Sequence, residues 1–223
     1  YWTIRYIETG NFEYRPIIHG PFYHHVNRHL FELFGATDFS MRLVVAVVGG
    51  LFPLVALLFR QRLRDTEVAA LALVFAVNPI VLYYSRFMRG DPLVAMFMFA
   101  AFACFVRVLD THDARFFHAG VVLTALGFTV KENALLYLVC WVGAGVLVAD
   151  YRLARGGDAD EARAAIVGVV GRGWALLRRY WGVGLVAAVE FLAVIVYFYA
   201  PRSATEPGPG LWDVLSDPGV APA

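Results

Sequence analysis

Lysine is nearly absent from this chain, and charge of either sign is sparse. Lys131 is the only lysine among the 19 lysine and arginine residues, and charged residues make up 17% of the sequence. The net charge of +1 provides no electrostatic footprint for nucleic acid, so no nucleic-acid partner is expected. The arginine excess mostly reflects a codon bias towards G and C, but it makes the position of the single lysine informative.

Cysteine is equally scarce, and no signal peptide opens the chain. Cys104 and Cys140 both lie inside apolar runs. We therefore expect small buried hydrophobic residues rather than a disulfide or a metal pair. The sequence starts at Tyr1 without a Met and stops at Ala223 without a structural reason. We expect it to be truncated at both ends.

Apolar residues are what the chain has in abundance. They form 60% of the sequence, and the mean hydropathy is +0.61, whereas a soluble domain is about half apolar. About 20 apolar residues cross a bilayer core, and flanking Tyr, Trp and Arg can extend slightly shorter runs. We predict an all-α, polytopic transmembrane bundle with about six spans. The apolar runs are Leu43–Phe59, Val68–Tyr84, Pro92–Leu109, Phe116–Val130, Ala134–Ala149 and Val183–Ala200.

Arginine placement predicts the topology. Arginines crowd the connections after the first, third and fifth runs, which should therefore face the cytoplasm. The chain then divides into an outer-face loop with interfacial helices at 1–41, a transmembrane domain at 42–200 and the start of an outer loop at 201–223. A cytoplasmic loop is expected at 150–182. We predict a multi-pass protein of the cell membrane whose site faces outward.

Some local features are also predicted. Phe22–Phe34 has its apolar residues on one helical face, which is typical of a helix lying in the membrane interface and ending at Gly35. Asp38 or Ser40 is expected to cap the first membrane helix. Interior prolines, Pro53 and that of Asn78-Pro79, should kink the first two spans.

The segment Ser85–Asp91 is unusual because it places two arginines and an aspartate between two apolar runs. Arg86, Arg89 and Asp91 would share the outer face with Lys131-Glu132 and with His19. Arginine and lysine bind phosphate, and an acid beside them can take a proton from a hydroxyl or coordinate a divalent cation. A lipid-linked phosphate lies at the same depth. Transfer from a polyprenyl-phosphate carrier fits this set, as does simple binding of anionic headgroups.

Plainer interpretations stay open. The charged groups could be interfacial caps, since a charge costs about 2.5–3.5 kcal/mol at the bilayer centre but much less at the interface. His25 and His29 have the spacing of zinc ligands, but no carboxylate motif accompanies them, so we expect no metal site and a solvated histidine face. Glu190, in the middle of the last span, is either functional, protonated or paired with an adjacent helix.

Several strings resemble membrane glycosyltransferases of the C-fold, closest to the protein-O-mannosyltransferase-like group, family 39. Ser85–Asp91 is similar to that group's arginine-aspartate element, and Thr129–Asn133 to its lysine-containing element. Together with His19-Gly20-Pro21, these elements look most like an archaeal family associated with flippase activity in protein glycosylation. The resemblance covers about residues 1–150 and includes the following strings: Glu8-Thr9-Gly10, Tyr14-Arg15-Pro16, Leu33-Phe34-Gly35, Asp38-Phe39-Ser40 and Arg42-Leu43.

The resemblance implies a role for each matching residue. Asp91 would help bind the acceptor, or a metal in metal-dependent members, and Arg86 and Lys131 would lie near the carrier phosphate. The family's first acid pair, the expected general base, would precede Tyr1, so residues 1–223 on their own are expected to be inactive.

Two functions from different classes follow, with a third in reserve. The intact protein is expected to move a sugar from a polyprenyl (dolichyl) phosphate donor to an acceptor, with Asp91, His19 and Glu132 as catalytic candidates. Arg86, Arg89 and Lys131 would bind the phosphate and the lipid carrier. The alternative is a non-catalytic protein that binds or helps translocate lipid-linked sugar. A structural subunit is the third possibility.

Overall fold

The computed structural model describes residues 1–15, 20–156, 178 and 181–202. Within these ranges the regular elements are helices, which confirms the predicted all-α membrane fold. The helices are α1 (Trp2–Thr9), α2 (Phe22–Phe34), α3 (Asp38–Leu51), the 3₁₀ helix η1 (Phe52–Phe59), α4 (Asp65–Val77), α5 (Pro79–Tyr84), α6 (Gly90–Thr111), α7 (Ala114–Val130), α8 (Ala134–Gly156) and α10 (Trp181–Tyr199).

Three of these helical stretches are long and apolar enough to cross a membrane: Asp38–Phe59, Gly90–Thr111 and Trp181–Tyr199. Ala114–Val130 and Ala134–Val148 are shorter apolar helices. The six predicted runs lie almost wholly in helices, although Val68–Tyr84 is divided between α4 and α5. The chain is a membrane protein. Most of the expected cytoplasmic loop at 150–182 and the tail after Arg202 lie outside the described residues.

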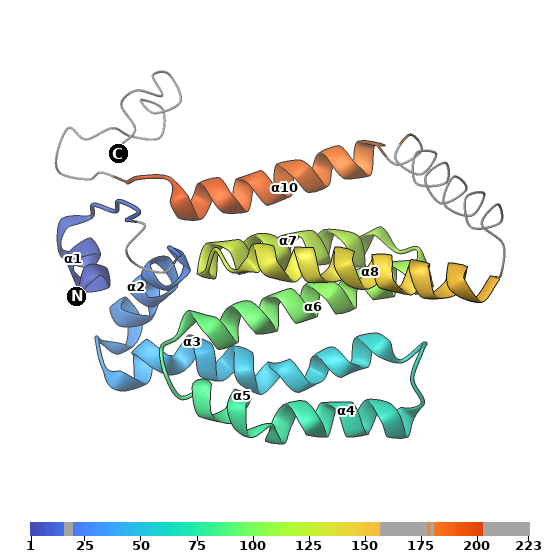
Figure 1. The fold of residues 1–223 in the computed structure, drawn as a ribbon. Coiled ribbons are helices and arrows are strands. Elements are labelled where there is room, and N and C mark those ends of the chain that lie inside the picture. The colour runs from blue at the N-terminus through green and yellow to red at the C-terminus, as the bar shows by residue number, and fades with distance from the viewer. Residues whose placement is uncertain (16–19, 157–177, 179–180, 203–223) are drawn as a thin grey trace.

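The long helices run back and forth along one direction, and α1 and α2 lie at one end of them (Figure 1). We call this the site end; it comprises residues 20–37, the loop 85–89, the loop 131–133 and residues 200–202. The opposite end holds the connections 60–64 and 112–113. The short connection 112–113 makes α6 and α7 antiparallel neighbours, and they form the most extensive pair among the described helices.

The protein core lies where α2 meets α6, α7 and α10. Phe22, Leu93, Met98, Val130 and Phe198 are all buried there. Half of the apolar window of α6 is buried, against 11% for α3–η1 and for α10. The apolar faces that remain exposed on these outer helices suit a hydrocarbon solvent, where their exposure carries no hydrophobic penalty.

Helix ends follow local chemistry, with one difference from expectation. Thr37, rather than Asp38 or Ser40, is the N-cap of α3, and its hydroxyl accepts a hydrogen bond from the Ser40 backbone N–H at 3.2 Å. Ser40 completes a capping box by accepting from the Thr37 N–H at 3.0 Å. The extended backbone of Thr37 provides the geometry that a cap requires, which Asp38 lacks as the first helical residue.

Both interior prolines lie where the α geometry of their span is interrupted. The α geometry of the first span changes to 3₁₀ at Phe52, directly before Pro53. The second span breaks at Asn78, whose side-chain oxygen accepts from the N–H groups of Ile80 and Val81 and so caps α5. At α2 the predicted bounds and the end at Gly35 are both observed.

Two expectations for single side chains are corrected. His25 is 2% exposed and bonds through Nε2 to the Phe198 carbonyl, because α2 turns that face into the core rather than towards solvent. Cys104 is buried as expected, but Cys140 is exposed on the apolar surface of α8; both are free thiols.

Candidate functional site

Asp91 and Lys131 meet at the site end. The Lys131 ammonium Nζ donates to Asp91 Oδ1 at 2.5 Å, joining the first turn of α6 to the residue that follows α7. The Lys131 side chain is 16% exposed, whereas that of Asp91 is 44% exposed. The only lysine of the chain is therefore fixed on a carboxylate that is itself accessible from outside the bundle.

Arg89 brings a second cation to the same carboxylate. Its Nε lies 3.4 Å from Asp91 Oδ2, and its guanidinium lies 5.6 Å from the centre of the Tyr84 ring. The Asp91 carboxylate thus lies between an arginine and a lysine, while the N-terminal turn of α6 contributes partial positive charge. Such a site attracts an anion, because two cations face one acid.

Close backbone approach holds this pair in place. The Gly20 N–H donates to the Val130 carbonyl at 3.0 Å, and a Cβ on Gly20 would lie 2.1 Å from the Thr129 carbonyl oxygen. Gly90 faces the same strip of chain, with the nearest Val130 atom 3.4 Å from its ideal Cβ position. Glycine is needed at position 20 because a side chain there would push the loop away from the end of α7.

Two tyrosines that the sequence reasoning did not single out as site residues complete the surroundings. The Tyr23 hydroxyl donates to the Arg89 carbonyl at 2.6 Å and so fixes the loop in front of α6. Burial, and then the nearby Asp91 charge, raises the pKa of Tyr23 above its ordinary value. The Tyr14 hydroxyl donates to Glu132 Oε1 at 2.7 Å, and burial together with this carboxylate raises the pKa of Tyr14.

The predicted site residues are partly brought together. Asp91, Arg89 and Lys131 are in contact, and Glu132 is the next residue but is bonded to Tyr14. Arg86 instead lines a separate crevice between α3–η1 and α4–α5. His19 lies outside the described residues. The tyrosine at position 14 was visible in the sequence only within the Tyr14-Arg15-Pro16 string.

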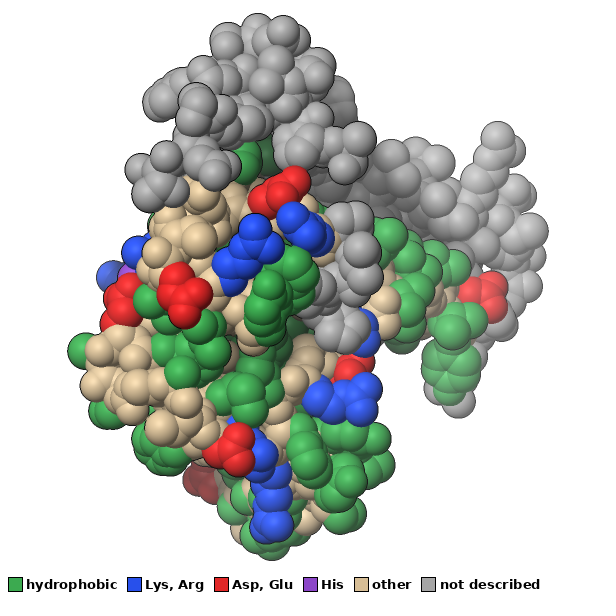
Figure 2. All heavy atoms as spheres, turned by 90° about the vertical axis from the view of Figure 1, so that its left-hand side faces the viewer, with side chains coloured by type: hydrophobic (Ala, Val, Ile, Leu, Met, Phe, Trp, Pro, Cys, Tyr) green, Lys and Arg blue, Asp and Glu red, His purple; other side chains and the backbone are tan. Residues whose placement is uncertain are grey.

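The site end is chemically mixed at its surface. Figure 2 shows this end with basic and acidic side chains lying close together among apolar ones. Among the described residues there is no group of three or more His, Cys, Asp or Glu side chains that could hold a metal ion. The two cations that face Asp91 make the described part of the site suited to an anionic group.

The remaining candidate, Glu190, has a partner on a neighbouring helix. Its Oε2 lies 2.7 Å from His118 Nδ1, and both side chains are partly buried between α10 and α7. Of the alternatives for Glu190, the structure shows the pairing between helices. Nothing in the sequence around His118 indicates this partner, which lies 72 residues away.

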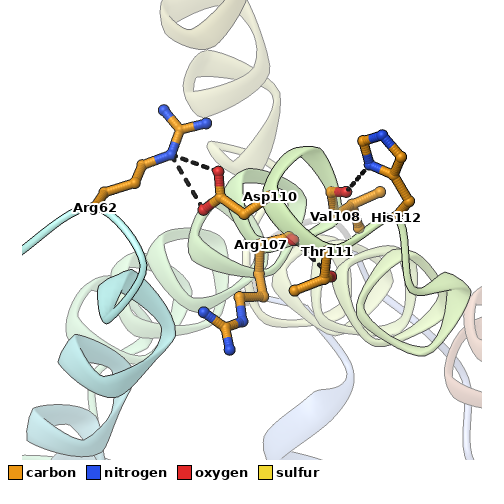
Figure 3. Close-up of polar contacts among 6 residues, drawn as sticks. All are labelled: Arg62, Arg107, Val108, Asp110, Thr111 and His112. Carbon is orange, nitrogen blue, oxygen red and sulfur yellow. Dashed lines mark hydrogen bonds and ion pairs between the residues drawn. The ribbon is translucent and has the colours of Figure 1, made fainter.

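The opposite end contains a different polar cluster. Arg62 donates through Nε to both carboxylate oxygens of Asp110, at 2.8 and 3.1 Å, which ties the connection after η1 to the last turn of α6 (Figure 3). Thr111 and His112 bond back to carbonyls of the same helix, so that α6 ends there. This cluster joins helix ends and leaves no excess of cations on the acid.

Comparison with known proteins places the chain in a family. Residues 18–157 match the family model described as dolichyl-phosphate-mannose-protein mannosyltransferase. No curated protein and no solved structure gives a significant match. The match extends over most of the chain and includes both halves of the Asp91–Lys131 pair. The chain therefore belongs to the dolichyl-phosphate-mannose-protein mannosyltransferase family, a group of membrane glycosyltransferases that use dolichyl-phosphate-linked sugar donors.

Proposed function

We propose that the intact protein transfers a sugar from a polyprenyl (dolichyl) phosphate carrier to an acceptor hydroxyl on the extracytoplasmic face of the cell membrane. The observation that carries this proposal is the Asp91 carboxylate held between Lys131 and Arg89 at one end of an apolar bundle. The end of an apolar bundle corresponds to the membrane surface, which is the depth at which the phosphate of a lipid carrier lies. Family membership supports the same donor class.

Each group has a proposed part in the reaction. The sugar carbon is bonded directly to a phosphate oxygen, and this bond breaks as the acceptor oxygen bonds to the carbon. Negative charge then grows on the departing phosphate, where Lys131 and Arg89 would stabilise it. Asp91 presents carboxylate oxygens that can accept a hydrogen bond from the acceptor hydroxyl, orient it and take up the proton that it releases as the new bond forms.

Glu132 is proposed as a second carboxylate beside this centre, held by Tyr14. The hydrogen bond of 2.7 Å from the Tyr14 hydroxyl orients the Glu132 carboxylate, and a carboxylate can accept several hydrogen bonds, including one from a substrate hydroxyl. His19, which precedes Gly20 in the sequence, is proposed as a further participant.

The decisive experiment is Asp91→Asn in membranes that carry the intact protein. Transfer of labelled sugar from a polyprenyl-phosphate donor into the protein fraction should fall by about 100-fold or more, the usual contribution of a positioned acid or base. Asp110→Asn, at the other end of the same helix, is the matched control and should leave transfer within about twofold. Full transfer by Asp91→Asn would overturn the catalytic proposal.

The alternative function predicts a different result in the same experiment. If the protein only binds or helps translocate lipid-linked sugar, Asp91→Asn would leave the donor trapped on the cytoplasmic face. Transfer would then recover when donor is supplied from outside. Recovery of that kind would replace the transferase proposal with translocation.

Cysteine labelling tests which side the site faces. In a background with Cys104→Ala and Cys140→Ala, Met88→Cys and Asn133→Cys should react with an impermeant maleimide added to intact cells. His112→Cys, at the opposite end, should react only after permeabilisation. Reversed labelling would place the site on the cytoplasmic face and refute this orientation.

A further inference from the structure

A second polar feature of the site end lies on the other side of the Ser85–Asp91 loop. The helices α3–η1 and α4–α5 enclose a crevice of about 530 Å³. Binding sites for small ligands have volumes of about 300–1,000 Å³, so this space is large enough to hold part of a ligand. Two arginines, Arg42 on α3 and Arg86 after α5, line it at the site end.

The walls of the crevice are mostly apolar, and the residues that line it from α3 below Arg42 are small. Gly49 and Gly50 line it from α3, with the nearest side-chain atom to Gly49 being Ser85 Cβ, 3.2 Å from its ideal Cβ position. At Gly50 no atom lies within 4 Å of that position, so the space beside it is open. The walls include Ala46, Gly50, Pro53, Ala76, Val81 and Leu82.

The length of the crevice matches one leaflet of a bilayer. From Arg42 to Pro53 the chain advances eleven residues along α3 and into η1, which corresponds to about 16 Å at 1.5 Å per residue. The hydrocarbon core of a bilayer is about 30 Å thick, so each leaflet contributes roughly half of that distance. A crevice with cations at the headgroup level and apolar walls to mid-membrane has the shape of a single leaflet lipid.

The charges in the crevice also need a partner. Arg42 lies 3.5 Å from Asp38, a carboxyl that is 83% exposed. The Arg86 guanidinium makes no hydrogen bond or ion pair within the described part of the chain, and its side chain is exposed. Two arginines against one aspartate leave one positive charge, which a single phosphodiester balances with the forked geometry that arginine favours.

We propose that this crevice binds one anionic phospholipid of the leaflet at the site end. Its phosphodiester lies between Arg42 and Arg86, and one hydrocarbon chain lies along Ala46 and Gly50. Basic pockets between membrane helices are a recurrent way of holding anionic headgroups. The lipid occupies a site separate from the sugar donor.

The geometry favours a bilayer lipid over the polyprenyl carrier. The reacting carbon of the donor is bonded to its phosphate, so the donor phosphate must lie beside Asp91. The cations in contact with Asp91 are Arg89 and Lys131, whereas Arg86 lies in the crevice with Arg42. A polyprenyl chain is also longer than one leaflet, and it is therefore longer than the crevice. The bound lipid would steady the loop that leads from Arg86 to Asp91.

Native mass spectrometry tests the proposal on the full chain released from nanodiscs of phosphatidylcholine with 20% phosphatidylglycerol. The wild-type protein should retain one phosphatidylglycerol, at least tenfold more often than phosphatidylcholine. Arg42→Gln with Arg86→Gln should reduce retention at least fivefold, and the lysine pair Arg42→Lys with Arg86→Lys should restore at least half of it. Circular dichroism of each variant confirms that its helices are intact.

Two glycine variants test whether a hydrocarbon chain of the lipid lies in the crevice. Gly50→Leu fills open space in the crevice and should reduce retention as strongly as the arginine variants. Gly184→Leu on α10 also enters open space, but outside the crevice, and should change nothing. Equal retention in all variants, or equal binding of phosphatidylcholine, would overturn the site. Displacement of phosphatidylglycerol by undecaprenyl phosphate with the same sensitivity to these variants would assign the crevice to the carrier and overturn the bilayer-lipid proposal.

Discussion

The helix α6 has one aspartate at each end, and the two are used differently. Asp91, in the first turn, is 44% exposed and faces both Lys131 and Arg89, whereas Asp110, in the last turn, is 12% exposed and faces Arg62. At the N-terminal turn the helix dipole favours a carboxylate, and at the C-terminal turn it opposes one. The positive charge around Asp91 therefore exceeds the single negative charge of its carboxylate. Asp110 is balanced by one arginine, Arg62.

The two ends of α6 show how a charged residue at a membrane surface can serve either to hold helices together or to bind a ligand. A covered acid paired with one cation closes its own charge balance and fastens two helix ends. An exposed acid with two cations attracts a further anion. The two ends of α6 can be tested against each other with equivalent substitutions.

The largest expected effect is on transfer. Lys131→Met removes one cation from Asp91 and should reduce transfer in membranes with the intact protein by about 10- to 100-fold, since a charge-assisted hydrogen bond contributes about 1.5–3 kcal/mol. Lys131→Arg should recover part of the activity. Arg62→Met makes the same kind of change at the other end and should leave transfer intact; a similar loss there would break the distinction between the two ends.

The next effect concerns the backbone contact that supports the site end. Gly20→Ala places a methyl group 2.1 Å from the Thr129 carbonyl oxygen, so the chain must shift, at a cost of about 2 kcal/mol or more. Gly120→Ala is the comparison, because its nearest neighbour is the Phe105 ring, which can turn aside. Thermal unfolding in detergent should show the larger loss for Gly20→Ala. Equal losses would mean that the Gly20 contact has no special role.

A pH dependence should come from the site end. Burial, and then the charge of Arg202, lowers the pKa of His25 to about 4 from the 6.5 of an exposed histidine. The folded state therefore binds this proton more weakly than the unfolded state, so stability is full above pH 6.5 and falls as the pH drops from 6.5 to 4. The loss should reach about 2 kcal/mol at pH 5.

Unfolding of the wild-type protein in detergent at pH 7 and pH 5 measures this loss. His25→Gln should be less stable at pH 7 but should lack the decline between the two values. His112→Gln, at the opposite end and exposed, serves as the control and should retain the decline. A decline that persists in His25→Gln would show that another group is responsible.

The smallest effect is expected at the opposite end. Arg62→Gln leaves the Asp110 carboxylate unpaired at the C-terminal turn of α6 and should lower the stability by about 1 kcal/mol, because Arg62 is half exposed. Thermal unfolding measures the loss, and transfer should not change. Asp110→Asn combined with Arg62→Gln should be no worse than Arg62→Gln alone, and additive losses would show that the two residues act independently.

Much of this organisation can be predicted from the sequence because membrane helices follow the length and continuity of apolar runs. The six runs, the break at Asn78-Pro79 and the bounds of α2 all follow from local patterns. The grouping of Asp91 with Lys131 follows from topology, since both residues were predicted on the same face of the membrane. The structure differs from the prediction where contacts between distant segments determine burial, as they do for His25.

The rest of the site depends on such distant contacts. Nothing near His118 in the sequence indicates Glu190, and nothing near Tyr14 indicates Glu132, because each pair comes from helices or loops that pack only in the folded chain. Arg86 and Arg89 are three residues apart, yet one lines the crevice and the other contacts Asp91. That separation depends on how the chain turns between α5 and α6, which residue types alone do not specify.

The 3₁₀ segment η1 makes the first membrane span longer than a uniform α-helix would be. Its eight residues rise about 2.0 Å each, against 1.5 Å in α geometry, so Asp38–Phe59 is about 4 Å longer than a uniform α-helix of the same sequence. Conversion of η1 to α geometry would shorten the span by that amount. Membranes of different organelles and organisms differ in thickness by a few ångströms. The winding of η1 alone therefore makes a difference to the length of this span as large as the differences in thickness between such bilayers.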